Sequence, residues 1–182
     1  MRELILLRHA HAESAGAGQD DIDRPLSRQG LAEAEAAGAW LKAHNQLPDR
    51  ILCPNARRAL VALEQVLLVT GFIEQRQEPR IYDATPGTLM QVADEHIECS
   101  RLMLVGHNPG LEQLVALLTS GQSGDFRGMP AAGLVALKDP ETGTVVVMDT
   151  SDPSARRRLQ VAVRGQAAQV FVDDQPERPG ER

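Results

Sequence analysis

Short runs of consecutive apolar residues alternate along the chain with longer segments in which apolar residues recur every three or four positions. The clearest run is Leu4-Ile5-Leu6-Leu7, which stops at Arg8 and His9. Consecutive large aliphatic residues between polar flanks are typical of a strand that is buried in a parallel sheet. The pattern therefore predicts a strand over residues 2–8, with an arginine and a histidine at its carboxyl end.

Other short apolar segments predict the remaining strands. Residues 101–105 repeat the pattern of the first strand, and residues 50–53 form a shorter version that ends at a proline. A weaker segment near Arg80-Ile81-Tyr82 predicts a further strand between these two. The runs at residues 131–137 and 144–148 flank a turn sequence, which favours an antiparallel hairpin.

The segments with helical spacing predict helices between the strands. Ser27 is a good N-cap, proline follows Thr85 at a second helix start, and Gly121 is placed to end the last helix. The expected helices cover residues 28–42, 56–69 with Asn55 as the cap, Thr85-Pro86 to about Glu98, and Leu111 to about Gly121.

Alternating strands and helices predict an α/β fold, with a mostly parallel sheet covered by helices on both faces. The chain has 182 residues, of which 42% are hydrophobic, and this suits a single domain. We place that domain at residues 1–173. Residues 156–173 are ambiguous between strand and helix, and residues 174–182 have the composition of a flexible tail.

Charge and cysteine content narrow the function classes. The formal net charge is −6, which weighs against nucleic acid as the main partner, since phosphate backbones bind basic surfaces. Two cysteines do not make a disulfide framework and favour a reducing compartment. No apolar run approaches the ~20 residues of a membrane span, and the run after Glu3 is too short for a signal peptide. We therefore expect a cytoplasmic protein with no membrane partner.

Two strand ends carry a histidine, and ligands of open α/β sheets bind beyond the carboxyl ends of the strands. His9 and His107 would then emerge at the same edge of the sheet, beside Arg8 and near Arg57 in the first turn of a helix. Arginine forks bind phosphate oxygens, and a neutral imidazole can attack phosphorus. Asp83 is the best-placed carboxylate to protonate a leaving group. Together, the two histidines, the two arginines and the aspartate predict a site for phosphoryl-group chemistry.

Simpler interpretations of the same residues stay open at the level of sequence. His9 and His11 could form a metal pair, although no third ligand has a helpful spacing. His107 could be a helix cap, and Asp83 could be a turn residue or an ordinary surface carboxylate. Arg8 and His9 could be polar residues at a strand end and nothing more.

Five segments resemble the histidine phosphatase superfamily, which has the phosphoglycerate mutase-like fold. Within it, residues 2–150 are most similar to the small SixA-type phosphohistidine phosphatases. The segments are Leu6-Leu7-Arg8-His9-Ala10, Asp23-Arg24-Pro25-Leu26-Ser27 with Gly30, Cys53-Pro54-x-x-Arg57, Ile81-Tyr82-Asp83 and Val105-Gly106-His107-Asn108-Pro109. The chain departs from the family pattern at Ala10 and Cys53, where glycine and serine are usual.

The resemblance implies a three-layer sandwich in which His9 is the phosphorylated residue. Arg8, Arg57 and His107 would complete the phosphate pocket, and Asp83 would be the acid. No metal and no organic cofactor are implied. The expected function is a metal-independent phosphatase with a phosphohistidine intermediate, acting on phosphohistidine in a protein. The alternatives are a phosphatase of a small phosphorylated metabolite and a non-catalytic phosphate-binding module. The oligomeric state is not predicted.

Overall fold

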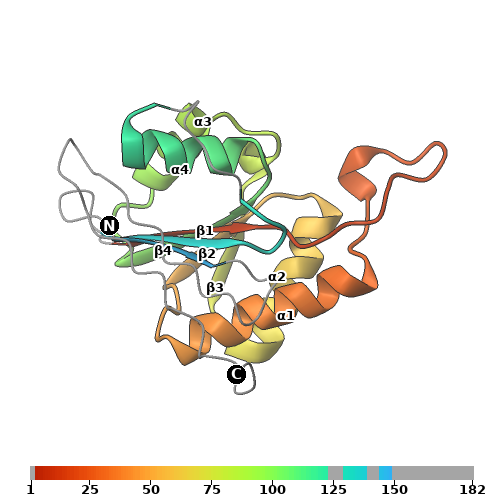
Figure 1. Ribbon diagram of the computed structural model, residues 1–182, viewed down its shortest axis with the longest axis horizontal. Helices are drawn as coiled ribbons and strands as arrows, with labels where there is room; N and C mark the ends of the chain where they lie inside the picture. Colours follow the sequence, from red (N-terminus) through yellow and green to blue (C-terminus); the bar gives the residue numbers. More distant parts are fainter. Residues whose placement is uncertain (1–2, 123–128, 139–143, 149–182) are drawn as a thin grey trace, which may run out of the picture.

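The computed structural model describes residues 3–122, 129–138 and 144–148 of the chain, and these residues form a sheet covered by helices on both faces (Figure 1). The sheet has six strands in the order β3-β2-β4-β1-β5-β6. In chain order the strands are β1 (Glu3–Arg8), β2 (Arg50–Cys53), β3 (Glu74–Gln77), β4 (Arg101–Gly106), β5 (Leu134–Lys138) and β6 (Thr144–Met148). Neighbours among β1 to β4 pair in parallel, while β5 pairs antiparallel with both β1 and β6.

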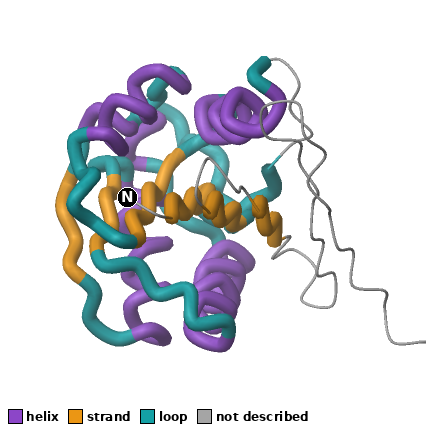
Figure 2. Tube along the Cα trace, turned by 90° about the vertical axis from the view of Figure 1, so that its left-hand side faces the viewer, coloured by secondary structure: helices purple, strands orange, loops and turns teal. Residues whose placement is uncertain are grey.

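Helices cover each face of the sheet as a separate layer (Figure 2). One layer contains α1 (Arg28–Ala43) and α2 (Arg57–Thr70), and the other contains α3 (Pro86–Asp94) and α4 (Gly110–Ser120). Alternate residues of the strands point to the two layers. In β1, Leu4 and Leu6 pack with the core under α3 and α4, whereas Ile5 and Leu7 pack with the core over α1 and α2. The predicted three-layer α/β sandwich is confirmed.

Most helix boundaries agree with the sequence signals. The hydroxyl of Ser27 accepts a hydrogen bond from Gly30 N–H at the start of α1, and Thr85 caps α3 in the same way. Gly121 ends α4 in the left-handed conformation, with φ +77°. The expected Asn55 cap is wrong, because Ala56 is the N-cap of α2 and makes no side-chain cap. Helix α3 ends at Asp94, before Glu98.

The strand expected near Arg80-Ile81-Tyr82 is also wrong. Pro79–Ile81 is a 3₁₀ helix, whose proline has no N–H for a strand ladder, and Ile81 is buried in the core. The strand lies earlier, at β3, where it pairs only with β2 at the edge of the sheet. Its sequence, Glu-Gln-Arg-Gln, has no apolar residue, so it carries no hydrophobic signal.

Several sequence expectations lie beyond the described residues. Residues 156–173 and 174–182 fall outside the described part of the chain, so the domain boundary at 173 stays a prediction. Among the described residues, no helix has both the length and the apolar character needed to cross a membrane.

Candidate active site

The carboxyl ends of β1 and β4 place the two histidines together. The strands are paired in parallel with Arg8 opposite Gly106, so His9 and His107 both follow directly at the same edge. His9 N–H donates to the carbonyl of Gly106 at 3.0 Å, and the imidazole centroids are 5.1 Å apart. The predicted juxtaposition of His9 and His107 is therefore confirmed by the geometry.

The hydrogen bonds of His9 identify which ring nitrogen carries the proton. Nδ1 lies 2.7 Å from the carbonyl oxygen of Ala10, which can only accept, so Nδ1 is the protonated nitrogen. Nε2 lies 3.4 Å from Arg58 Nε, which can only donate. Burial lowers the pKa of His9 to about 4, and the Ala10 carbonyl opposes this shift. At neutral pH, His9 is a neutral imidazole with a lone pair on Nε2.

Arg58, and not Arg57, is the arginine beside His9. Arg57 is exposed, whereas Arg58 is 4% exposed and lies on the buried face of α2. The physical reason is the helical phase: Arg58 is four residues before Ala62, which faces inward, and Arg57 is one position out of phase. The expected place of Arg57 in the pocket is wrong. The apolar spacing of the helix contained the signal that would have identified Arg58.

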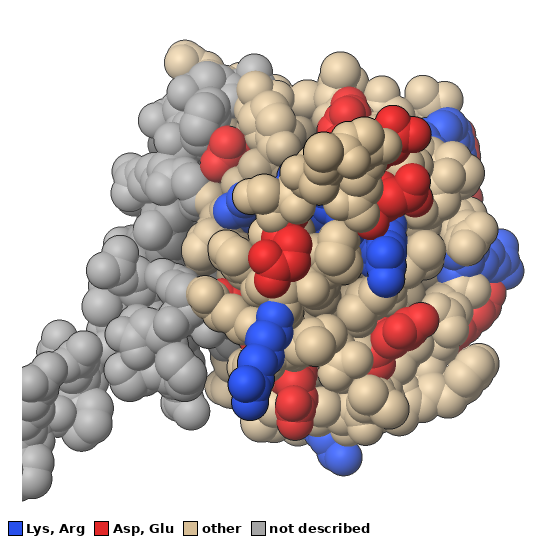
Figure 3. Space-filling view, turned by 90° about the vertical axis from the view of Figure 1, so that its right-hand side faces the viewer, with Lys and Arg blue, Asp and Glu red and all other residues tan. Residues whose placement is uncertain are grey.

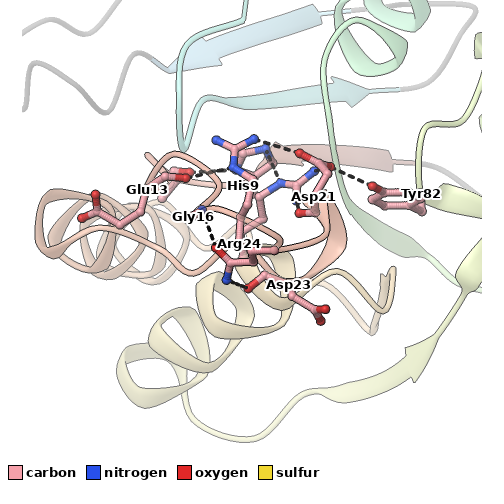
Figure 4. Close-up of polar contacts among 10 residues, drawn as sticks. His9, Glu13, Gly16, Asp21, Asp23, Arg24 and Tyr82 are labelled. Carbon is pink, nitrogen blue, oxygen red and sulfur yellow. Dashed lines mark hydrogen bonds and ion pairs between the residues drawn. The ribbon is translucent and has the colours of Figure 1, made fainter.

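Asp21 holds the Arg58 guanidinium in place from a 3₁₀ turn, Asp21–Asp23, in the loop after β1. One Arg58 Nη donates to the Asp21 carbonyl at 2.6 Å, and the other donates to the Asp21 carboxylate at 2.9 Å. Tyr82 donates its hydroxyl to the same carboxylate at 2.7 Å, and Arg24 donates to its other oxygen (Figure 4). The Tyr82 and Arg24 bonds hold the pKa of Asp21 well below its usual range. Sequence reasoning missed Asp21, which has no local signal.

His107 is buried, with 7% of its surface exposed. Within the described part of the chain, neither of its ring nitrogens has a hydrogen-bond partner. Burial lowers its pKa to about 3, and the nearby His9 and Arg58 lower it further. Tyr82 packs edge-on against the imidazole with centroids 5.3 Å apart. A buried N–H without an acceptor is costly, so this ring is suited to receive an anion.

Arg8 places a second guanidinium near the two histidines, and its charge lowers the pKa of both His9 and His107. It is half-buried, and its Nη1 donates to the Met129 carbonyl at 2.8 Å. Asn108 donates to the same carbonyl, also at 2.8 Å. Burial lowers the pKa of Arg8, and the charges of Glu112 and Glu33 oppose the shift. The face at this edge of the sheet carries both acidic and basic side chains (Figure 3).

Asp83 does not join these groups through any described hydrogen bond or ion pair. It is exposed, and its backbone is left-handed with φ +48°, which is typical of an aspartate in a turn. The strand it was expected to follow is absent, because residues 79–81 are a 3₁₀ helix. Its role as an acid stays a proposal.

The metal alternative has no supporting geometry in the part of the chain that the structure describes. His11 Nδ1 lies 2.7 Å from the hydroxyl of Ser27, the N-cap of α1. No group of three or more histidine, cysteine, aspartate or glutamate side chains is placed to hold a metal ion among the described residues. Burial raises the pKa of the Cys53 thiol to about 12, so this thiol is neutral.

Comparisons with known proteins agree with this geometry. The family model of the histidine phosphatase superfamily (branch 1) matches residues 4–104. The uncharacterized protein Rv1276c of Mycobacterium tuberculosis is 36% identical over 143 residues, covering 75% of this chain and 84% of its own. An uncharacterized chloroplast protein of Arabidopsis thaliana is 34% identical over 146 residues, covering 74% of this chain and 66% of its own.

Solved structures show the same fold. A structure from Agrobacterium tumefaciens, described provisionally as the phosphohistidine phosphatase SixA, is 29% identical with a TM-score of 0.70, covering 75% of this chain and 91% of that one. The protein histidine phosphatase SixA complexed with tungstate has a TM-score of 0.70 at 22% identity, over 82% of this chain and 97% of that one. The match to the family model covers more than half of the sequence and includes Arg8, His9 and Arg58. The chain belongs to the histidine phosphatase superfamily.

Proposed function

We propose that the protein is a phosphatase in which His9 Nε2 attacks phosphorus and carries the phosphoryl group as an intermediate. The observation that carries this proposal is the pair of contacts on the His9 ring: Ala10 holds Nδ1–H, and the Nε2 lone pair faces the guanidinium of Arg58. A neutral imidazole whose Nδ1 holds the proton keeps its lone pair on Nε2 and is an activated nucleophile.

The reaction has two displacements at phosphorus. In the first, the Nε2 lone pair forms the P–N bond while the bond to the leaving group breaks, and the leaving group takes that electron pair. In the second, water attacks phosphorus, the P–N bond breaks, Nε2 recovers its lone pair, and the phosphate leaves with the protons of that water. Arg8, Arg58 and His107 stabilise the negative charge on the phosphoryl oxygens in both transition states.

Asp83 is the proposed proton donor for leaving groups that need one. It follows Tyr82, whose ring contacts His107, and its exposure leaves it free to reach a bound substrate. An exposed donor suits a site in which the leaving group stays near solvent. Leaving groups that depart as stable species require little help from such an acid.

The proposed substrate is phosphohistidine in a protein. The support is the 29% identity to the Agrobacterium tumefaciens structure described as SixA, which covers 91% of that chain. A small phosphorylated metabolite is the competing substrate. A neighbour described as mycobacterial glucosyl-3-phosphoglycerate phosphatase has the same fold with a TM-score of 0.61, but at 18% identity it supports only the fold.

Hydrolysis of p-nitrophenyl phosphate tests the activity, with and without a chelator. We expect turnover in both conditions, complete loss in His9→Ala, and near-normal turnover in His11→Ala, the matched control two residues along the chain. A parallel assay compares a phosphohistidine-containing protein with a panel of sugar and nucleotide phosphates. Faster turnover of the metabolites would contradict the proposed substrate, and tight phosphate binding without hydrolysis would contradict the proposed activity.

A further inference from the structure

Glu33 is a buried carboxylate that the proposed reaction does not use directly. It lies on α1 with 7% of its surface exposed. Burying a carboxylate costs free energy unless hydrogen bonds and charges compensate, and most buried helix positions take an apolar residue instead. Its Oε2 accepts the backbone N–H of His11 at 2.9 Å, and its Oε1 accepts from Gln29 Nε2 at 2.7 Å.

The peptide unit that Glu33 contacts is the one that holds His9. The N–H of His11 and the C=O of Ala10 belong to the same planar trans peptide, so they point in opposite directions. Glu33 binds the N–H side at 2.9 Å, and His9 Nδ1 donates to the C=O side at 2.7 Å. The carboxylate and the imidazole are therefore connected through one peptide unit.

We propose that Glu33 is a positioning residue that acts through the Ala10–His11 peptide, fixing the Nδ1–H tautomer of His9 and so keeping Nε2 unprotonated. An N–H that donates to a carboxylate increases the negative charge on the carbonyl oxygen of its peptide, because hydrogen-bonded chains polarise one another. The stronger Ala10 acceptor then holds Nδ1–H more firmly. It also stabilises the positive charge that the ring gains when Nε2 bonds to phosphorus.

The Ala10 carbonyl, which Glu33 would strengthen as an acceptor, acts on His9 against three nearby positive charges. The charged groups whose influence reaches the ring are Arg58 from α2, Arg8 from β1 and Arg24 from the loop after β1, and all three lower its pKa. The Ala10 carbonyl is the contact that raises the pKa of the ring. The next peptide unit along the chain, His11–Ala12, is also held in place. The backbone N–H and the hydroxyl of Ser27 both donate to the His11 carbonyl, at 3.0 and 3.2 Å.

Glu33→Gln tests the charge while keeping the shape. The amide oxygen still accepts from His11 N–H, and the exposed Gln29 side chain can turn its own oxygen toward the new NH₂ group. Glu35→Gln, on the exposed face of α1, is the matched control. We expect Glu33→Gln to keep its melting temperature and KM but to lose about tenfold in kcat, because charge-assisted hydrogen bonds are about twice as strong as neutral ones.

Nuclear magnetic resonance of the His9 ring supplies a readout that a purely structural role would not change. In the ¹⁵N-labelled wild type, we expect the proton on Nδ1, with its resonance moved upfield in Glu33→Gln and unmoved in Glu35→Gln. A proton on Nε2 in the wild type overturns the proposal even if the variant does not fold. An unmoved resonance in Glu33→Gln overturns it whatever the activity does. The inference rests on the proposed nucleophile, but an active His9→Ala variant would refute that nucleophile separately and leave the resonance result standing.

Discussion

Replacing each of the two neighbouring arginines in turn gives the sharpest test of the site geometry. Arg58 is 4% exposed and makes three polar contacts, one to His9 Nε2 and two to Asp21. Arg57, one residue earlier, is exposed. A site that contained Arg57 would be damaged by its loss, whereas a site built around Arg58 would keep its contacts.

The magnitude follows from what Arg58→Ala removes. Its guanidinium is the donor beside the attacking nitrogen, and losing one such preorganised donor typically lowers kcat by about 10²–10³-fold. Asp21 is half exposed as a side chain and keeps its bonds to Arg24 and Tyr82, so we expect the Arg58→Ala variant to fold. We expect Arg57→Ala to retain turnover within about twofold, as surface substitutions usually do.

The assay is steady-state hydrolysis of p-nitrophenyl phosphate, with circular dichroism melting to confirm folding. Arg58→Lys keeps the charge but loses the fork that binds both His9 and Asp21, so we expect intermediate activity. Equal loss of kcat in Arg57→Ala and Arg58→Ala, with both variants folded, would refute the assignment of Arg58.

Further predictions concern pH, packing and the leaving group. Because protonation removes the Nε2 lone pair of His9, kcat/KM should fall on the acid side with a midpoint near the His9 pKa of about 4. Folded-state pKa values of about 4 for His9 and about 3 for His107 lie below the unfolded value, so acid favours the unfolded chain, which binds more protons. Stability should be complete above about pH 6.5 and should fall as the pH drops toward these values, and a flat melting temperature from pH 7 to 4 would contradict this. Gly30→Ala should lower the free energy of unfolding by about 1–3 kcal/mol in urea titrations, since its Cβ would lie 2.0 Å from the His11 carbonyl oxygen. An unchanged midpoint would show that α1 and the segment around His11 move apart at little cost. Asp83→Asn should slow hydrolysis of alkyl phosphates and spare p-nitrophenyl phosphate, and equal effects on both would argue against an acid at this position.

The fold and the meeting of the two histidines could be predicted because both depend on local patterns. Buried parallel strands have a strong apolar signal, and their carboxyl ends share one edge of the sheet. β1 and β4 satisfy this rule, which places His9 beside His107. The strand β3 has the opposite character: it is polar, pairs on one side only and leaves no pattern to detect.

The remaining site residues depend on tertiary contacts or on helical phase. The choice of Arg57 followed the spacing from Cys53, but the buried face of α2 contains Arg58, Ala62 and Val66. No sequence rule places Asp21 against Arg58, because the two are 37 residues apart and meet only when the loop after β1 folds over α2. The acid assignment depended on a strand that the proline-led 3₁₀ turn replaces.

The position of the phosphoryl group on the trapped enzyme shows whether His9 Nε2 is the nucleophile. After brief reaction with a ³²P-labelled phosphate donor and quenching in base, the label should be acid-labile and base-stable. Digestion and mass spectrometry should place it on the peptide containing His9, and ³¹P resonance should identify the Nε2 isomer. Label on Nδ1 of His9, on any other residue, or undiminished in His9→Ala would contradict the account.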